Sequence, residues 1–351
     1  MSSSAGRPAT PAGGAQAGPS ADGSAATVLE SQGVTKHFTR GGGILAALLG
    51  RKAPVVRAVE NVDLRIEERM VYGLVGESGS GKSTLGMTLV KLYEPTGGRI
   101  LFRGRDTTHL KGAGLKAYRR DAQIIFQDPY GSLNPRLTVG QIVEEPLKIH
   151  GFRDKTERAA RVIRALEQVR VPPAEYLHRH PHELSGGLRQ RVAIARTIIL
   201  EPSFIVADEP VSMLDVSVQA GILELLRSLS QEMGLAVLYV SHDIATVRYV
   251  CQRVAVMYLG RIVEHGDTEQ VITRPTHPYT QRLMAAVPSV DPTVRRTRVG
   301  IDDGLEADEL GTDWFSRQLA AEGRSCPEPG AHWVEVDPGH YAACHLHGST
   351  P

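Results

Sequence analysis

The stretch Met70–Tyr93, MVYGLVGESGSGKSTLGMTLVKLY, decides the fold. It begins with a short apolar run, MVYGLV, of the kind that forms a buried strand, and passes directly into a glycine-rich turn. The residues that follow, KSTLGMTLVKLY, carry apolar side chains at helical spacing. The order of strand, glycine-rich turn and helix predicts an α/β fold with a phosphate-binding loop.

The glycine-rich turn matches the pattern of a loop that binds nucleotide phosphates. Its glycines let backbone N–H groups turn inward around phosphate oxygens at the start of a helix. We expect Lys82 to neutralise the β- and γ-phosphates and Ser83 to bind Mg²⁺, so that ATP and Mg²⁺ are the expected ligands. A structural glycine turn is the alternative, which the position between strand and helix disfavours. The candidate residues are Gly76, Glu77, Ser78, Gly79, Ser80, Gly81, Lys82, Ser83 and Thr84.

Sequence on both sides of this loop extends the α/β interpretation. VLESQGVTKHF and VVRAVENVDLRI predict strands near the start, and the second alternates apolar with polar residues. SFIVADEP and LAVLYVSHD are apolar runs typical of parallel strands covered on both faces, with GILELLRSLSQEMG as the helix between them. RDKTERAARVIRALEQVR predicts an amphipathic helix. We therefore expect an α/β core with an antiparallel β element and a helical insertion at about residues 128–191.

Composition sets the domain boundaries. Residues 1–27 are almost entirely Ala, Gly, Ser, Pro and Thr, which cannot bury enough surface to order, so we expect a disordered tail there. Residues 28–274 form the predicted domain, in which RGGGILAALLGRKAP reads as a loop. Residues 275–351, rich in Pro, Gly, His and acidic side chains, read as an irregular C-terminal extension. The 351 residues, 41% hydrophobic, exclude a disordered or fibrous protein.

Charge and cysteine content narrow the class of protein further. Lys and Arg number 40 against 39 Asp and Glu, so no overall field attracts nucleic acid or anionic lipid. No apolar run approaches the roughly 20 residues that cross a bilayer, and the N-terminus lacks a signal peptide's pattern. The three cysteines are too scattered for a disulfide framework, which favours a reducing compartment. We predict a cytoplasmic protein that does not itself span a membrane.

A carboxylate pair, Asp208 and Glu209, ends the apolar run FIVAD. Open α/β sheets bind ligands at the carboxyl ends of their strands. We expect Asp208 to hold Mg²⁺ through its water shell and Glu209 to orient and polarise the attacking water. The alternative, two acids that cap the next helix, carries less weight in a chain that also has a phosphate loop.

A second predicted anion site lies at Ser185, Gly186 and Gly187, where LSGGLRQR begins a helix. One triphosphate does not need two such sites in one chain, so the pattern suggests a site shared between two protomers. Here the sequence resembles the ATP-binding subunits of ABC transporters, in which this signature loop closes over the nucleotide of the other subunit. Leu188 stands where that family usually has Gln, which we expect to weaken closure. The resemblance covers about residues 28–289 and implies a P-loop, RecA-like ATPase core.

Four further residues match motifs of that family, and their roles are those the resemblance implies. Phe38, in KHF, matches the aromatic residue that stacks on adenine. Gln127, in IFQDP, matches the glutamine that contacts metal and water and links to the membrane subunits. Asp215, in SMLD, matches the aspartate that communicates across the dimer, and His242, in VSHD, matches the switch histidine near the γ-phosphate. Because Lys82 is also present, we expect an active ATPase.

The stretch after the core, RPTHPYTQRLMAAVP, resembles the extension of oligopeptide and dipeptide importers, as does QDPYGSLNP. This resemblance implies peptide import, two transmembrane permease subunits, a second ATPase subunit that is identical or paralogous, and an extracytoplasmic solute-binding protein. It places the chain at the cytoplasmic face of the plasma membrane, with no nucleic-acid partner. Alternatives are import of another solute such as nickel, a soluble non-transport ABC ATPase, and a module that binds ATP without hydrolysing it.

Two groups of residues raise the question of a metal site. Some members of the importer group carry four cysteines near the C-terminus, whereas only Cys326 and Cys344 are available here, too few for a Cys₄ site. A zinc site that combines them with His345 and His347 fits no common spacing. His178, His180 and His182 lead directly into the signature loop, and we interpret them as structural.

Overall fold

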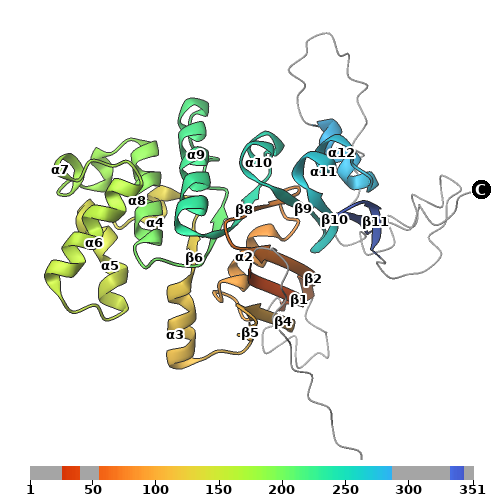
Figure 1. The fold of residues 1–351 in the computed structure, drawn as a ribbon, viewed down its shortest axis with the longest axis horizontal. Coiled ribbons are helices and arrows are strands. Elements are labelled where there is room, and N and C mark those ends of the chain that lie inside the picture. Colours follow the sequence, from red (N-terminus) through yellow and green to blue (C-terminus); the bar gives the residue numbers. More distant parts are fainter. Residues whose placement is uncertain (1–25, 40–54, 287–332, 344–351) are drawn as a thin grey trace, which may run out of the picture.

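Two β-sheets lie at the centre of the structure, a computed structural model that describes residues 26–39, 55–286 and 333–343 (Figure 1). Residues 1–25 of the expected N-terminal tail, the expected loop at 40–54 and the tail cysteines Cys326 and Cys344 lie outside these residues, whereas Thr27, the last residue of that expected tail, already begins a strand. The two predicted strands near the start are confirmed: they are β1 and β2 of a four-stranded antiparallel sheet in the order β2-β1-β4-β5. Its strands are β1 Thr27–Thr39, β2 Val55–Glu67, β4 Gly97–Phe102 and β5 Arg105–Asp106.

The second sheet has eight strands in the order β11-β12-β10-β9-β3-β8-β7-β6. The five from β9 to β6 run parallel, and β10, β12 and β11 extend the sheet with antiparallel pairs. The predicted parallel strands are therefore confirmed. The strands are β3 Val71–Val75, β6 Ala122–Ile125, β7 Phe204–Asp208, β8 Ala236–Ser241, β9 Arg253–Tyr258, β10 Arg261–Asp267, β11 Val334–Asp337 and β12 His340–Ala342.

Helix α2, Lys82–Leu89, packs between the two sheets. Leu85 and Leu89 of this helix are fully buried in one apolar cluster with residues of both sheets, such as Leu29 of β1 and Val206 of β7. Gly86 faces β7 so closely that a Cβ there would lie 2.8 Å from a methyl group of Val206. The phosphate loop, which we define as Gly76–Thr84, is therefore held between a strand end and a helix that has little freedom to move.

Helices cover the other face of the eight-stranded sheet and form the predicted helical part (Figure 1). The helical part continues to Ile198, where helix α8 ends, and so extends beyond our estimate of residue 191. Asp154 begins α6 as its N-cap, accepting hydrogen bonds from the N–H groups of Thr156 and Glu157. The remaining helices are α3 Gly112–Asp121, α4 Pro129–Ser132, α5 Val139–Ile149, α6 Lys155–Gln168, α7 Pro173–Tyr176, a 3₁₀ turn Pro181–Glu183, α8 Gly186–Ile198, α9 Val216–Met233, α10 Ile244–Val250, α11 Thr268–Thr273 and α12 Pro278–Ala286.

The C-terminal region is more regular than its composition suggested. Where described, it forms helix α12 and the hairpin β11–β12, which joins the main sheet beside β10. His340 and Ala342 of β12 are buried, whereas the strands themselves are only four and three residues long. Strands this short carry almost no periodic signal, and the pairing with β10 is made across more than 70 residues of sequence.

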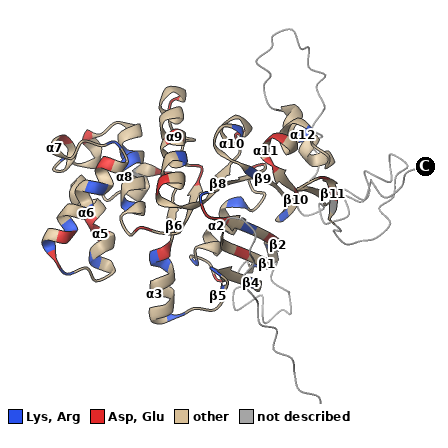
Figure 2. Cartoon of the chain, viewed as in Figure 1, with Lys and Arg blue, Asp and Glu red and all other residues tan. Residues whose placement is uncertain are grey.

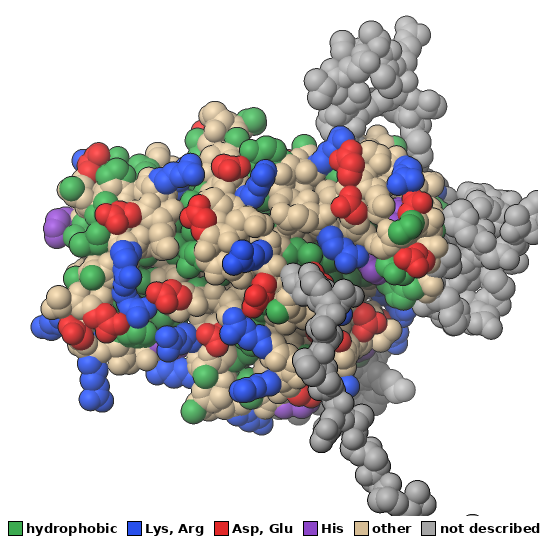
Figure 3. All heavy atoms as spheres, viewed as in Figure 1, with side chains coloured by type: hydrophobic (Ala, Val, Ile, Leu, Met, Phe, Trp, Pro, Cys, Tyr) green, Lys and Arg blue, Asp and Glu red, His purple; other side chains and the backbone are tan. Residues whose placement is uncertain are grey.

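The face of the molecule shown in Figure 3 carries charge of both signs. Lys and Arg alternate with Asp and Glu along the helices and around the sheets (Figures 2 and 3). Among the described residues, no helix has the length and apolar character required to span a bilayer. The interspersed charges agree with the near-zero net charge and give no single-sign surface on the face shown.

The packing of α2 predicts which leucines matter for stability. Leu85→Ala, at a site with no exposed surface, should lower the free energy of unfolding by about 2–5 kcal/mol, because it leaves a cavity between the sheets. Leu92→Ala, just beyond the same helix and 45% exposed, should change it by less than about 0.5 kcal/mol. Chemical denaturation measures both, and similar losses for the two variants would contradict this packing.

Candidate active site

The phosphate loop is folded tightly against its neighbours because two of its glycines have no room for a side chain. A Cβ on Gly76, at φ +153°, would lie 2.2 Å from the carbonyl oxygen of Met257 in β9. A Cβ on Gly81, at φ +104°, would lie 2.1 Å from that of Ala58 in β2. Gly81 also begins α2 in the left-handed conformation, which glycine adopts without strain. The loop therefore depends on glycine for both its shape and its position.

Lys82 crosses the inside of the loop and is almost fully buried, at 5% exposure. Its ammonium donates hydrogen bonds to the carbonyl oxygens of Gly76, at 2.8 Å, and Glu77, at 2.7 Å. Burial lowers the pKa of Lys82, while the nearby carboxylates of Glu209, Asp208 and Glu77 partly oppose that shift. A desolvated cation inside a ring of backbone groups is a suitable counter-charge for phosphate oxygens.

Ser83 and Asp208 bring two oxygen ligands together at the mouth of the loop. The Ser83 hydroxyl donates to Asp208 Oδ1 at 2.9 Å, which joins the start of α2 to the end of β7. Asp208 is 5% exposed, and its burial raises the pKa of its carboxyl group. Hydroxyl and carboxylate oxygens are the ligands that Mg²⁺ takes alongside phosphate, so this pair fits the ion.

Glu209 lies at the centre of a three-residue arrangement. Its Oε2 accepts a hydrogen bond from the Gln127 amide at 2.8 Å, and its Oε1 lies 2.9 Å from His242 Nδ1. The backbone of Glu209 has φ +45°, a conformation that a non-glycine residue adopts at a cost and that is enriched at functional sites. Both oxygens of the carboxylate are therefore held in position, facing the region of Lys82 and Asp208.

The sheet topology explains why these residues meet. The phosphate loop, His242, Glu209 and Gln127 follow or end β3, β8, β7 and β6, which are consecutive neighbours in the parallel part of the sheet. The carboxyl ends of parallel strands lie along one edge, where open α/β sheets bind ligands. Sequence segments more than 100 residues apart are thereby brought to one site.

Phe38 lies beside an aromatic residue that sequence reasoning missed. Its ring packs edge-on against Tyr93, with centroids 5.3 Å apart, and the ammonium of Lys36 lies 4.9 Å from the Phe38 centroid. Lys36 also donates to the carbonyl of Glu94, which fixes its position. The half-buried Phe38 therefore belongs to an aromatic and cationic cluster at the edge of the antiparallel sheet. Tyr93 follows helix α2, so the pattern of the strand that carries Phe38 could not indicate it.

Ser185, Gly186 and Gly187 lie in the helical part of the molecule. Ser185 is the N-cap of α8, where its hydroxyl accepts from the N–H of Leu188, and it belongs to the helical part, whereas α2 lies between the sheets (Figure 1). A Cβ on Gly187 would lie 2.5 Å from a methyl group of Val218, so this glycine allows α8 and α9 to approach.

Asp215 is exposed at the start of α9, next to two apolar side chains that face solvent. Met213 is 56% exposed and Val216 is 81% exposed. The start of α9 therefore leaves apolar surface exposed on both sides of Asp215.

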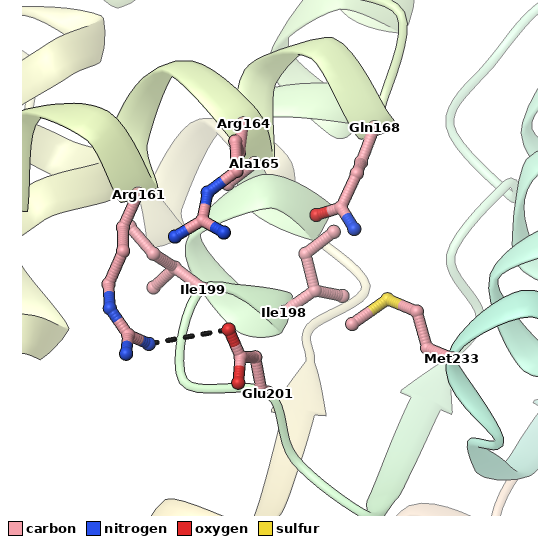
Figure 4. A pocket seen from close by; sticks show the side chains of 8 residues that line it. All are labelled: Arg161, Arg164, Ala165, Gln168, Ile198, Ile199, Glu201 and Met233. Atoms are coloured by element: carbon pink, nitrogen blue, oxygen red, sulfur yellow. Dashed lines mark hydrogen bonds and ion pairs between the residues drawn. The ribbon is translucent and has the colours of Figure 1, made fainter.

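Two further features of the described residues lie outside this site. His180 stacks on His182 at 5.6 Å, and among the residues that the structure describes no cluster of three His, Cys, Asp or Glu residues is arranged to hold a metal. A cavity of about 290 Å³ lies between α6, α8 and α9, lined by Arg161, Arg164, Gln168 and Glu201 over Ile198 and Met233 (Figure 4). It contains none of the residues assigned to phosphate binding or catalysis.

Comparison with protein families gives two matches. Residues 59–212 match the family described as ABC transporter. The matched range contains the phosphate loop, Gln127, Ser185 and the Asp208–Glu209 pair. Residues 263–310 match the oligopeptide/dipeptide transporter C-terminal region, which includes α12.

Curated proteins and solved structures give the same result. The chain is 44% identical to a putative peptide import ATP-binding protein of Brucella ovis, over 90% of this chain and 97% of that one. It is 40% identical to the oligopeptide transport ATP-binding protein AppF of Bacillus subtilis, over 92% and 98%. A dimeric ATP-binding cassette, MJ0796, solved with ADP and phosphate, is 31% identical, with a TM-score of 0.59 over 68% of this chain and 98% of that one.

The burial of Asp208 predicts a pH-dependent effect on stability. A carboxyl group whose pKa is raised by folding lowers the free energy of unfolding when it is ionised. This cost is present at neutral pH and disappears as the pH falls below the pKa of the group. Without nucleotide, Asp208→Asn should therefore raise the Tm at pH 7 by about 2–4 °C, and by much less in acid. The control is Asp63→Asn at an exposed position, and a Tm gain that did not depend on pH would contradict this explanation.

Proposed function

The chain belongs to the ABC transporter ATPase family, and from that premise we propose that it is the ATP-hydrolysing subunit of a peptide importer. The observation that carries the proposal is the Glu209 carboxylate, held on one side by Gln127 and on the other by His242. It lies at the same sheet edge as the phosphate loop and the Ser83–Asp208 pair. This arrangement suits phosphoryl transfer to water, which requires positioned charges and one group to orient the nucleophile.

Each residue of the site has a distinct role in this proposal. The N–H groups of the phosphate loop and the ammonium of Lys82 bind the phosphates of ATP. Ser83, Asp208 and Gln127 would hold Mg²⁺, which would supply positive charge beside the β- and γ-phosphates. Glu209 accepts a proton from the attacking water, while His242 and Gln127 keep its two oxygens in place.

A second ATPase subunit completes the site. Ser185, Gly186 and Gly187 begin a helix in the helical part, away from this chain's own phosphate loop, and so are available to the γ-phosphate side of a nucleotide bound by a partner. The exposed apolar residues beside Asp215 provide a contact surface for such a pair. ATP then joins the two subunits head to tail, and its hydrolysis separates them.

The transported solute is assigned from the relatives. Proteins similar along nearly their whole length are named for peptide and oligopeptide import, and residues 263–310 match the C-terminal region of such transporters. A glutathione import ATP-binding protein of Escherichia coli is also 46% identical, over 47% of its length. The chain works with two membrane permeases at the cytoplasmic face of the membrane, and a solute-binding protein delivers the peptide.

Replacement of Glu209 tests its role as the base. Glu209→Gln should keep ATP binding but slow turnover by roughly 10²-fold or more, because the amide cannot take up the proton of the attacking water. Glu68→Gln, on the turn before β3, is the matched control and should turn over ATP at the wild-type rate. Steady-state phosphate release measures both. Turnover of Glu209→Gln within a few-fold of wild type would remove Glu209 from the mechanism.

Replacement of Lys82 tests phosphate binding. Lys82→Ala should weaken ATP binding by about 10–100-fold, as expected when a charged hydrogen-bond donor is lost from a buried site. Lys91 is a matched control, because it is also 5% exposed, donates to a backbone carbonyl and follows the same helix at its other end. Lys91→Met should lower stability without changing ATP affinity. Calorimetry of folded variants that showed equal affinities for Lys82→Ala and wild type would contradict the assignment.

Affinity purification tests the transport function. Tagged Glu209→Gln chain should be isolated from native membranes with ATP and Mg²⁺, and the associated proteins identified by mass spectrometry. We expect two integral membrane subunits, an ATPase subunit and a peptide-binding protein. Recovery of a binding protein specific for nickel would correct the solute, whereas recovery of ribosomes or nucleic acid without membrane proteins would overturn the transport proposal.

A further inference from the structure

Tyr279, which belongs to none of the nucleotide-binding motifs, contacts the phosphate loop. The backbone N–H of Glu77 donates a hydrogen bond to the Tyr279 hydroxyl oxygen at 3.0 Å, across 202 residues of sequence. Tyr279 lies in the first turn of α12 and is 7% exposed, and its ring packs on Tyr258 at the end of β9 with centroids 4.2 Å apart. The C-terminal region is thus in direct contact with the loop that binds phosphate.

The hydrogen bond acts on the residue that also holds Lys82. The Glu77 carbonyl accepts from the Lys82 ammonium at 2.7 Å and from the N–H of Ser80 at 3.2 Å. The Glu77 N–H, on the other side of the same residue, is held by Tyr279. Glu77 is therefore fixed from outside by a phenol and from inside by the ammonium. Loss of either bond frees its backbone to rotate.

A buried polar network keeps Tyr279 in place. Glu264 of β10 has no exposed surface, and its carboxylate accepts from the backbone N–H groups of Thr276, at 2.9 Å, and His277, at 2.8 Å. His340 of β12 lies 2.7 Å from the same carboxylate. His277 Nδ1 in turn accepts from the N–H of Tyr279 at 3.1 Å.

The charge states of Glu264 and Tyr279 agree with a network that holds Tyr279 rigidly in place. Burial alone would raise the pKa of Glu264, but the hydrogen bonds from His340 and the two backbone N–H groups outweigh it and lower that pKa. Three donors therefore hold the carboxylate in its ionised form. Burial raises the pKa of the Tyr279 phenol, so its hydroxyl is neutral when it accepts from Glu77. Neither group is arranged to titrate in the physiological range.

We propose that Tyr279 is a positioning residue of the nucleotide site, through which the C-terminal region holds the phosphate loop in its ATP-binding shape. It contacts neither the phosphates nor the attacking water and acts through Glu77 and Lys82. The inference rests on ATP binding at this loop, as proposed above. A loop that is ordered before ATP arrives loses less conformational freedom on binding, so the anchor raises affinity.

Tyr279→Phe is the direct test, because it removes only the hydroxyl and keeps the ring on Tyr258. We expect ATP and ADP to bind about 3–10-fold more weakly, as for the loss of one hydrogen bond, and turnover at saturating ATP to stay within twofold of wild type. Tyr118→Phe is the matched control. Its hydroxyl is also buried and donates to a backbone carbonyl, at Leu89, so its loss should lower the Tm and leave ATP affinity unchanged.

Hydrogen exchange gives a second measurement that does not depend on activity. In the nucleotide-free protein, peptides covering residues 76–84 should exchange faster in Tyr279→Phe than in wild type or Tyr118→Phe. Wild-type affinity for ATP together with unchanged exchange in a folded Tyr279→Phe protein would overturn the inference. If wild type itself bound no ATP, the proposed function would fail instead, so the two failures are distinguishable.

Discussion

The buried ammonium of Lys82 is the interaction on which the rest of the site depends. A cation at 5% exposure has lost most of its water, and the loss is offset by two backbone carbonyls and by the carboxylates nearby. Those carbonyls belong to Gly76 and Glu77, so the lysine and the loop shape each other. In the proposed function, phosphate oxygens bring further negative charge directly to this ammonium, which suits the loop to a polyphosphate.

The phosphate loop is also surrounded tightly by backbone groups of neighbouring segments. Backbone carbonyls of Ala58 and Met257 close on its glycines, and the N–H of Gly260 donates to the Ser80 carbonyl at 2.9 Å. The Glu209 carboxylate is held as closely, by Gln127 after one neighbouring strand and His242 after the other. In the proposed function, one chain presents a rigid half of a site, and the signature loop, in the helical part, supplies the other half to a partner. ATP bound between the two subunits would then join them as a pair.

Local sequence patterns predicted the parts of this fold that depend on short-range order. The order of strand, glycine-rich loop and helix identified Lys82 and Ser83, and the apolar run before Asp208 and Glu209 identified the strand end where they lie. Gln127 and His242 were expected only through family resemblance, since their meeting at Glu209 depends on the order of β8, β7 and β6.

Tyr93, Tyr279 and the β11–β12 hairpin were not predicted as parts of the site or sheet. Each is defined by a contact between segments distant in sequence, such as the bond between Tyr279 and Glu77. No local periodicity records such contacts. The most direct test of the shared site is ATP turnover per subunit, measured over a range of concentrations of the ATPase subunits purified together. A site completed by a partner predicts a rate that rises with concentration to a plateau, whereas a rate that stayed constant down to full dissociation would contradict it.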